Sequence, residues 1–162
     1  MDWDAIGAVG EIIGAIAVLI SLIFVGLQVR LSAAQTEKSN ALARADMNER
    51  AMRTFGDTVV ELARNQELAL AFRKVMIKPA ELTEGELTIV LAFFNVWLHR
   101  HRTAFLSVAD GLIDPQVILD FDSSTKWYLT SPLFKNEWIR TKNTGAFTGE
   151  FSDHIEGLIA QG

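Results

Sequence analysis

The sequence contains no cysteine. Disulfide bridges, zinc–thiolate sites, iron–sulfur clusters and cysteine nucleophiles are therefore all excluded. Histidine and proline are scarce, with three residues of each among 162. The shortage of proline, together with many Ala, Leu, Ile and Val residues, favours helical structure.

Positive charge is also in short supply. The chain carries 15 Lys and Arg residues against 20 Asp and Glu residues, which gives a formal net charge of −5. A nucleic-acid-binding protein needs a basic face. We therefore predict no nucleic-acid partner.

The first thirty residues almost lack charge. Between Ala5 and Val29, only Glu11 is ionisable, and the chain is apolar from Ile12 to Leu27 apart from Ser21. As a helix, residues 5–27 would be roughly 35 Å long, enough to cross a hydrocarbon core of about 30 Å. Residues 5–29 are thus predicted to form a transmembrane helix, with the lipid bilayer as its first partner.

A cleaved signal peptide is the competing interpretation, because small residues follow the apolar run at positions 32–34. Signal peptides begin with a basic region and have an apolar region of about 7–15 residues. Here the start, Met1–Asp4, is acidic and the apolar run is longer. We therefore expect the helix to be retained.

Basic residues after the apolar run predict its orientation. Cytoplasmic flanks of membrane helices are enriched in Lys and Arg. Residues 1–4 are accordingly expected outside the cytoplasm and the rest of the chain inside it. The basic residues that follow the run are Arg30, Lys38, Arg44, Arg50 and Arg53.

Downstream of residue 30, the pattern predicts helices only. No Gly or Pro interrupts positions 28–55, so the membrane helix is expected to continue as a cytoplasmic extension over 30–63, with Gly56 as the expected kink. A helical bundle domain is expected over 64–162, because no segment shows the two-residue alternation of a strand. The fold class is thus all-α, a single N-terminal transmembrane helix continuing into a cytoplasmic helical bundle. Helix starts are indicated by Asn65, Thr83–Glu86, Asp114–Pro115, Ser131–Pro132 and Thr148–Gly149.

The segment Leu87–Val108 is the most apolar part of this domain. We interpret it as the central helix of the bundle, buried nearly all round. The alternative is a helix on the membrane surface, with Phe93, Phe94 and Trp97 in the interface. Residues that would contact the membrane surface are Trp3, Arg30, His99, Arg100 and Arg102.

Small residues recur in the membrane helix at alternating steps of three and four, which places them along one face. We call this face the small-residue seam; it consists of Gly7, Gly10, Gly14, Ala17 and Ser21. Small residues let helix backbones approach closely in lipid. The seam therefore predicts packing against a second copy of the chain or another membrane protein.

Glu11 is an acid within the apolar run and flanks the seam. Ionisable residues inside membranes are functional-site candidates. Three interpretations stay open: shelter at a partner interface, extension to the nearby aqueous surface, or a role in conducting ions or protons.

No residue set predicts catalysis or a cofactor. His99 and His101 are two positions apart, so on a helix they point about 200° apart and cannot chelate one metal ion. Asp120 and Asp122 follow an apolar run as in haloacid-dehalogenase-type phosphatases, but a helix start precedes them and no βαβ pattern surrounds them. We interpret them as two exposed acids near a helix end.

The chain resembles a large uncharacterised family of small bacterial membrane proteins. The matching residues are Trp3, Ala5–Gly7, Gly10–Ala17, Gln28–Arg30, Asn65–Ala69, Gly111–Asp114 and Ser131–Phe134. The resemblance implies a location in the bacterial inner (cytoplasmic) membrane and an N-terminal membrane helix before a helical domain. It implies no activity.

Together these features predict a non-enzymatic, membrane-anchored assembly or accessory subunit. It would associate through the small-residue seam and the helical domain. The alternative is a homo-oligomeric channel or proton-conducting pore lined by Glu11.

Overall fold

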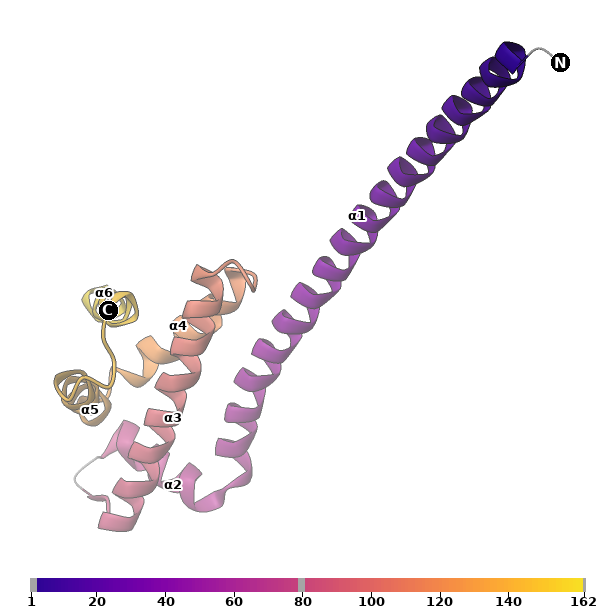
Figure 1. Cartoon of the computed structure of the whole chain (residues 1–162). Helices are drawn as coiled ribbons and strands as arrows, with labels where there is room; N and C mark the ends of the chain where they lie inside the picture. Colours follow the sequence, from indigo (N-terminus) through magenta and orange to yellow (C-terminus); the bar gives the residue numbers. More distant parts are fainter. Residues whose placement is uncertain (1–2, 79–80, 162) are drawn as a thin grey trace. The chain divides into compact units, whose positions relative to one another are not determined.

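The computed structural model describes residues 3–78 and 81–161 (Figure 1). Within these residues it contains six α-helices and no strand, which confirms the predicted all-α class. The long apolar N-terminal helix and the helical bundle are both present as expected. The helices are α1 Trp3–Arg64, α2 Gln66–Ile77, α3 Glu84–Ala109, α4 Gln116–Tyr128, α5 Pro132–Asn143 and α6 Glu150–Ala160.

The chain divides into two compact units, Met1–Ala43 and Arg44–Gly162. We call them the N-terminal unit and the bundle unit. Helix α1 continues past Gly56 to Arg64. Its last turns belong to the bundle unit, which therefore begins earlier than residue 64, where the sequence analysis placed the domain boundary.

Helix α3 lies at the centre of the bundle unit and contacts α2, α4, α5 and α6. Its buried side chains include Phe93, Phe94 and Trp97, so these rings form the protein core and do not lie on a membrane surface. Val96 is 47% exposed, however. The expectation of burial nearly all round is therefore wrong on one side of this helix.

Local capping explains where two of the helices begin. The Asn65 side chain accepts a hydrogen bond from the Leu68 amide over 3.0 Å at the start of α2. At the start of α3, Thr83 and Glu86 form a reciprocal capping box. These interactions satisfy amide groups that a helix leaves without intrahelical partners.

The starts of α4 and α5 also lie close to the predicted positions. The N-cap of α4 is Pro115, one position after the predicted Asp114, and it makes no side-chain cap. The Asp114 carboxylate instead accepts a hydrogen bond from the Gln116 amide over 2.8 Å, two residues on, in the turn that precedes the helix. Ser131 occupies the N-cap of α5, but its hydroxyl donates to the carbonyl of Val75 instead of capping. This serine thus links α5 to α2.

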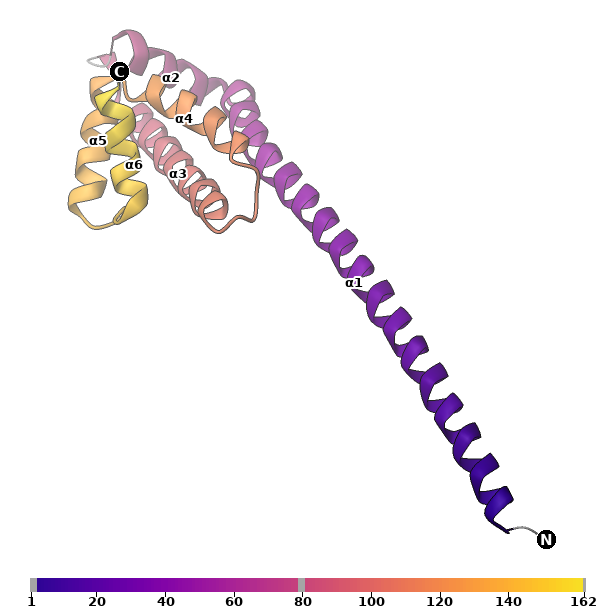
Figure 2. The same cartoon turned by 90° about the horizontal axis from the view of Figure 1, so that it is seen from above.

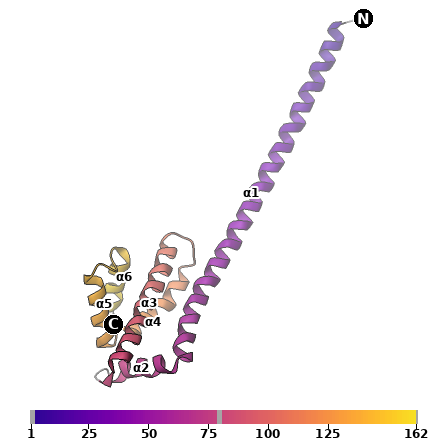
Figure 3. The same cartoon turned by 60° about the horizontal axis from the view of Figure 1, so that its bottom comes forward.

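Helices α5 and α6 lie side by side and are joined by a short connection (Figures 2 and 3). The Trp138 indole is fully buried between them, and its Nε1 donates to the Glu156 carboxylate over 2.9 Å. Its ring packs near Phe147 and Phe151, with centroid distances of 5.8 and 6.4 Å. Aromatic packing therefore holds this helix pair together.

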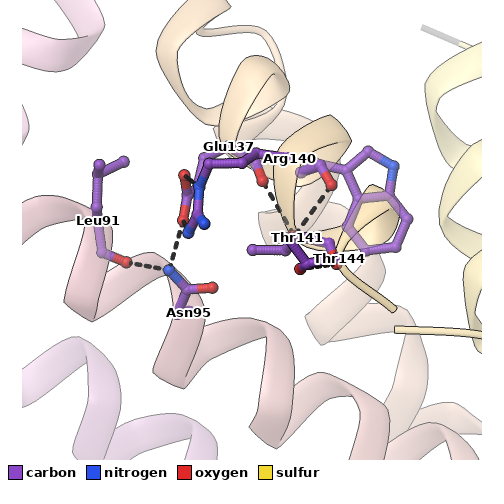
Figure 4. Close-up of polar contacts among 7 residues, drawn as sticks. Leu91, Asn95, Glu137, Arg140, Thr141 and Thr144 are labelled. Carbon is purple, nitrogen blue, oxygen red and sulfur yellow. Dashed lines mark hydrogen bonds and ion pairs between the residues drawn. The ribbon is translucent and has the colours of Figure 1, made fainter. Parts of the chain in front are cut away.

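A buried carboxylate joins α5 to α3 (Figure 4). Glu137 has a side chain only 4% exposed and accepts two hydrogen bonds from the Arg140 guanidinium, over 2.6 and 2.7 Å. It also accepts one from the Asn95 amide over 2.7 Å. The bonds from Arg140 and then Asn95 hold the pKa of Glu137 below its ordinary value, although burial acts in the opposite direction.

Glu137→Gln is expected to lower the free energy of unfolding at pH 7 by about 1–3 kcal/mol, because charge-assisted hydrogen bonds are lost. The folded-state pKa lies below the unfolded value, so the carboxylate stabilises the protein above the ordinary glutamate pKa of 4.5. This stabilisation disappears as pH falls through the folded-state pKa. Urea unfolding of the full chain in detergent, followed at several pH values, measures both effects.

Glu61→Gln is the matched control, because Glu61 is exposed. In acid, the stability of wild type is expected to fall more steeply than that of the Glu137 variant, whereas the Glu61 variant should follow wild type. Equal slopes for wild type and Glu137→Gln would contradict the assigned role.

Candidate functional site

Helix α1 presents an apolar surface in the N-terminal unit that no described residue of this unit covers. Every side chain from Gly7 to Ala43 is exposed. Among the described helices, only α1 contains a stretch long and apolar enough to cross a membrane, and none of that stretch is buried within the chain. Its large apolar side chains are 50–69% exposed, from Val9 to Leu31.

The small-residue seam lies on one face of α1. At 100° per residue, its five members fall within an arc of about 80°. Side-chain methyl groups added at Gly7, Gly10 or Gly14 would meet no atom within 4 Å. The Ser21 hydroxyl donates to the Ala17 carbonyl over 2.9 Å and so has a partner inside its own helix.

The other residues predicted to act at a membrane are divided between the units. Glu11 and Arg30 are exposed on α1, with Glu11 about 80° from the centre of the seam. The Trp3 side chain lies outside the described residues. In the bundle unit, His99 is exposed and Arg102 is half-buried.

Arg100 is half-buried and has a partner inside the protein. Its guanidinium donates to the hydroxyl of Thr58, which is 2% exposed, and so joins α3 to the last turns of α1. Both Arg100 and His99 line a groove of about 440 Å³ between these helices, together with apolar residues such as Met47, Val96 and Ile113. Arg100 therefore has a structural role whether or not it also contacts lipid headgroups.

The structure brings together three residues that the sequence analysis did not group. His101 on α3, Asp122 on α4 and His154 on α6 each direct one polar atom to a common point; we call them the His–Asp–His cluster. The Asp122 Oδ1 atom lies 2.9 Å from His101 Nε2 and 2.7 Å from His154 Nε2. These contacts join three helices of the bundle unit through a single carboxylate oxygen.

The buried end of this cluster continues to Thr125. The Thr125 hydroxyl lies 2.9 Å from His101 Nδ1 and accepts a hydrogen bond from the Trp97 indole over 2.8 Å. His101, Thr125 and Trp97 are all fully buried. The orientation of the His101 ring is therefore fixed from both of its nitrogens.

Burial and the neighbouring charged groups have opposite effects on the pKa values of the cluster. Burial of the His101 ring lowers its pKa, although Asp122 acts in the opposite direction. For Asp122, burial would raise the pKa, but the hydrogen bonds from His101 and His154 outweigh it and hold the pKa below its ordinary value. Asp122 is thus held as a carboxylate between the two histidine rings.

One expectation is corrected here. Asp122 is not an exposed acid near a helix end, because it lies in the middle of α4 with a side chain only 15% exposed. Its partner His101 is fully buried. No local pattern in the sequence indicated His154 as a partner of His101.

Comparisons of the chain with protein-family models, with curated proteins and with solved structures gave no match. The resemblance to the bacterial membrane family therefore stays a prediction. Function has to be argued from the chain itself.

Proposed function

We propose that this protein is a single-pass membrane protein and a non-enzymatic assembly or accessory subunit. The observation that carries the proposal is the uncovered apolar surface of the N-terminal unit. Burying one Ile, Leu, Val or Phe side chain is worth about 1.5–3 kcal/mol. A helix with more than ten such side chains exposed needs a lipid or protein environment to cover them.

The small-residue seam supports association in addition to anchoring. In a helix interior, glycine costs about 1 kcal/mol relative to alanine. No contact among the described residues requires the glycines of the seam, since methyl groups added there meet no atom within 4 Å. Close packing against another membrane helix supplies a reason for them, because van der Waals contact drives such packing in lipid.

The proposed location is the bacterial inner membrane, with the N-terminus outside and the bundle unit in the cytoplasm. The basic residues that follow the apolar run support this orientation, beginning with Arg30 and Lys38. The helical bundle would then hold a cytoplasmic partner or a second copy near the membrane.

Gly14→Ile is expected to weaken self-association of the full chain in liposomes by about tenfold, or about 1.4 kcal/mol. The bulky side chain would keep the two helix backbones apart at the centre of the seam. Energy transfer between labelled copies, measured over a range of protein-to-lipid ratios, determines the change.

Gly26→Ile provides a matched control, because the same substitution then lies about 140° from the centre of the seam. It should leave association unchanged. The seam is not a self-association surface if wild type does not associate, or if both variants associate as wild type does. Copurification of another membrane protein would then test whether the chain is an accessory subunit.

The pore is the second candidate, and the position of Glu11 in the apolar run beside the seam favours it. The assembly function predicts no proton flux through liposomes that contain the purified wild-type chain. Flux that is present in wild type and lost in Glu11→Gln would establish the pore instead.

A further inference from the structure

We infer that the His–Asp–His cluster is a binding site for a divalent transition-metal ion of the Zn²⁺ type. This inference concerns the bundle unit and goes beyond the proposed membrane function, on which it does not depend. One ligand atom from each of the three residues lies within 4.8 Å of the other two. The Nε2 atoms of His101 and His154 are the nitrogens that contact Asp122 Oδ1. They come from three different helices that are packed in one compact unit.

The donor set indicates the class of metal. Imidazole nitrogen suits zinc, copper, iron and nickel, whereas magnesium and calcium prefer oxygen ligands. Two imidazoles and one carboxylate are a known ligand combination for zinc with three protein ligands. The cluster therefore favours a transition metal over Mg²⁺ or Ca²⁺.

The two nitrogen–oxygen separations require only a small adjustment. In a tetrahedral zinc site with bonds of about 2.0–2.1 Å, neighbouring ligand atoms are about 3.3 Å apart. The two nitrogen–oxygen separations are 2.9 and 2.7 Å, so each would open by roughly half an ångström. His154 can supply most of this movement, because its side chain is 25% exposed whereas the His101 ring is enclosed.

The surroundings of His101 fit metal binding as well as hydrogen bonding. When Nε2 binds a metal, the ring proton moves to Nδ1 and needs an acceptor. The Thr125 hydroxyl oxygen lies 2.9 Å from Nδ1 and has two lone pairs, one of which accepts the Trp97 N–H. The second lone pair can accept the Nδ1 proton once the Thr125 O–H turns away from the ring.

The cluster is also accessible. Asp122 and His154 are 15% and 25% exposed, so an ion can enter past them and a water molecule can take the fourth coordination position. His101 provides the buried, rigid ligand. This combination of one enclosed and two partly exposed ligands gives the ion both a fixed anchor and an entry path.

The test uses the full-length chain in detergent, purified without a polyhistidine tag and stripped of metal with a chelator. Addition of Co²⁺ is expected to produce the visible absorption bands of a four-coordinate site, saturating at one ion per chain. Zn²⁺ should displace the Co²⁺ and raise the thermal unfolding midpoint, because it binds the folded state. A chain without Co²⁺ bands and without a Zn²⁺-dependent midpoint would overturn the inference.

His154→Gln and Asp122→Asn should each weaken Co²⁺ binding at least tenfold. The third histidine gives a matched control, since His99 is exposed and lies outside the cluster. His99→Gln should bind Co²⁺ as wild type does, and circular dichroism establishes that each variant is folded. Equal binding by wild type and folded His154→Gln, or equal loss in His99→Gln, would show that the cluster is only a hydrogen-bonded link between helices.

Discussion

Trp97→Ala is expected to lower the free energy of unfolding of the bundle unit by about 3–5 kcal/mol. The indole is 0% exposed, and its ring packs against Phe55, Phe121 and Tyr128 at centroid distances of 5.5, 5.4 and 5.1 Å. It thus joins α3 to α4 and to the last turns of α1. Domains have a total stability of about 5–15 kcal/mol, so this loss is a large part of the whole.

The same substitution also removes a buried hydrogen bond. The Trp97 N–H is a donor to Thr125, which in turn fixes the ring of His101. Without the indole, the Thr125 hydroxyl loses a partner inside the core, and this adds to the cost of the cavity. Loosening of the His–Asp–His cluster should follow.

Trp127→Ala is the matched control, because the Trp127 side chain is 52% exposed. Urea unfolding of both variants in detergent, followed by far-ultraviolet circular dichroism, measures the difference. The Trp127 variant should lose about 1 kcal/mol. A Trp97 variant as stable as the Trp127 variant would contradict the assignment of Trp97 to the centre of the core.

The double substitution Ile16→Arg with Ile20→Arg is expected to abolish membrane integration. Both residues lie in the middle of the apolar run, 50% and 61% exposed, and away from the small-residue seam. An arginine near the centre of a membrane helix costs about 2.5–3.5 kcal/mol, so the pair costs roughly 5–7 kcal/mol. Extraction of membranes with alkaline carbonate should therefore release the variant but not wild type.

Ala41→Arg with Ala45→Arg is the control, with the same spacing and the same added charge beyond the apolar run. This variant should remain in the membrane pellet. If the variant with charges at 16 and 20 also stays in the pellet, the apolar run is not the membrane anchor.

Local chemistry explains why much of the fold could be predicted. The cap at Asn65 and the capping box at Thr83 depend on residues three positions apart, so the sequence displays the whole interaction. The apolar run likewise needs no distant partner to be recognised. The all-α class and the helix starts could therefore be predicted from these local features.

Contacts between distant segments could not be predicted in this way. Asp122 is 21 positions from His101 and 32 from His154, and only the packing of α3, α4 and α6 brings them together. Thr58 is similar, since its buried hydroxyl accepts a hydrogen bond from Arg100, 42 positions away. The predicted domain boundary at residue 64 differs from the start of the bundle unit at Arg44 for the same reason. Helical periodicity shows that a helix has an apolar face, but not which residues cover that face.

The most direct test of the account is cysteine accessibility, since the natural chain has no cysteine and each introduced thiol is unique. Asp4→Cys, Ile16→Cys and Ser39→Cys are each treated in intact cells with a membrane-impermeant maleimide. A membrane-spanning α1 with its N-terminus outside should be labelled at position 4 in intact cells, at position 39 only after lysis, and at position 16 only after detergent unfolding. Labelling of all three in intact cells, or of position 16 in lysed cells without detergent, would contradict a membrane-spanning α1.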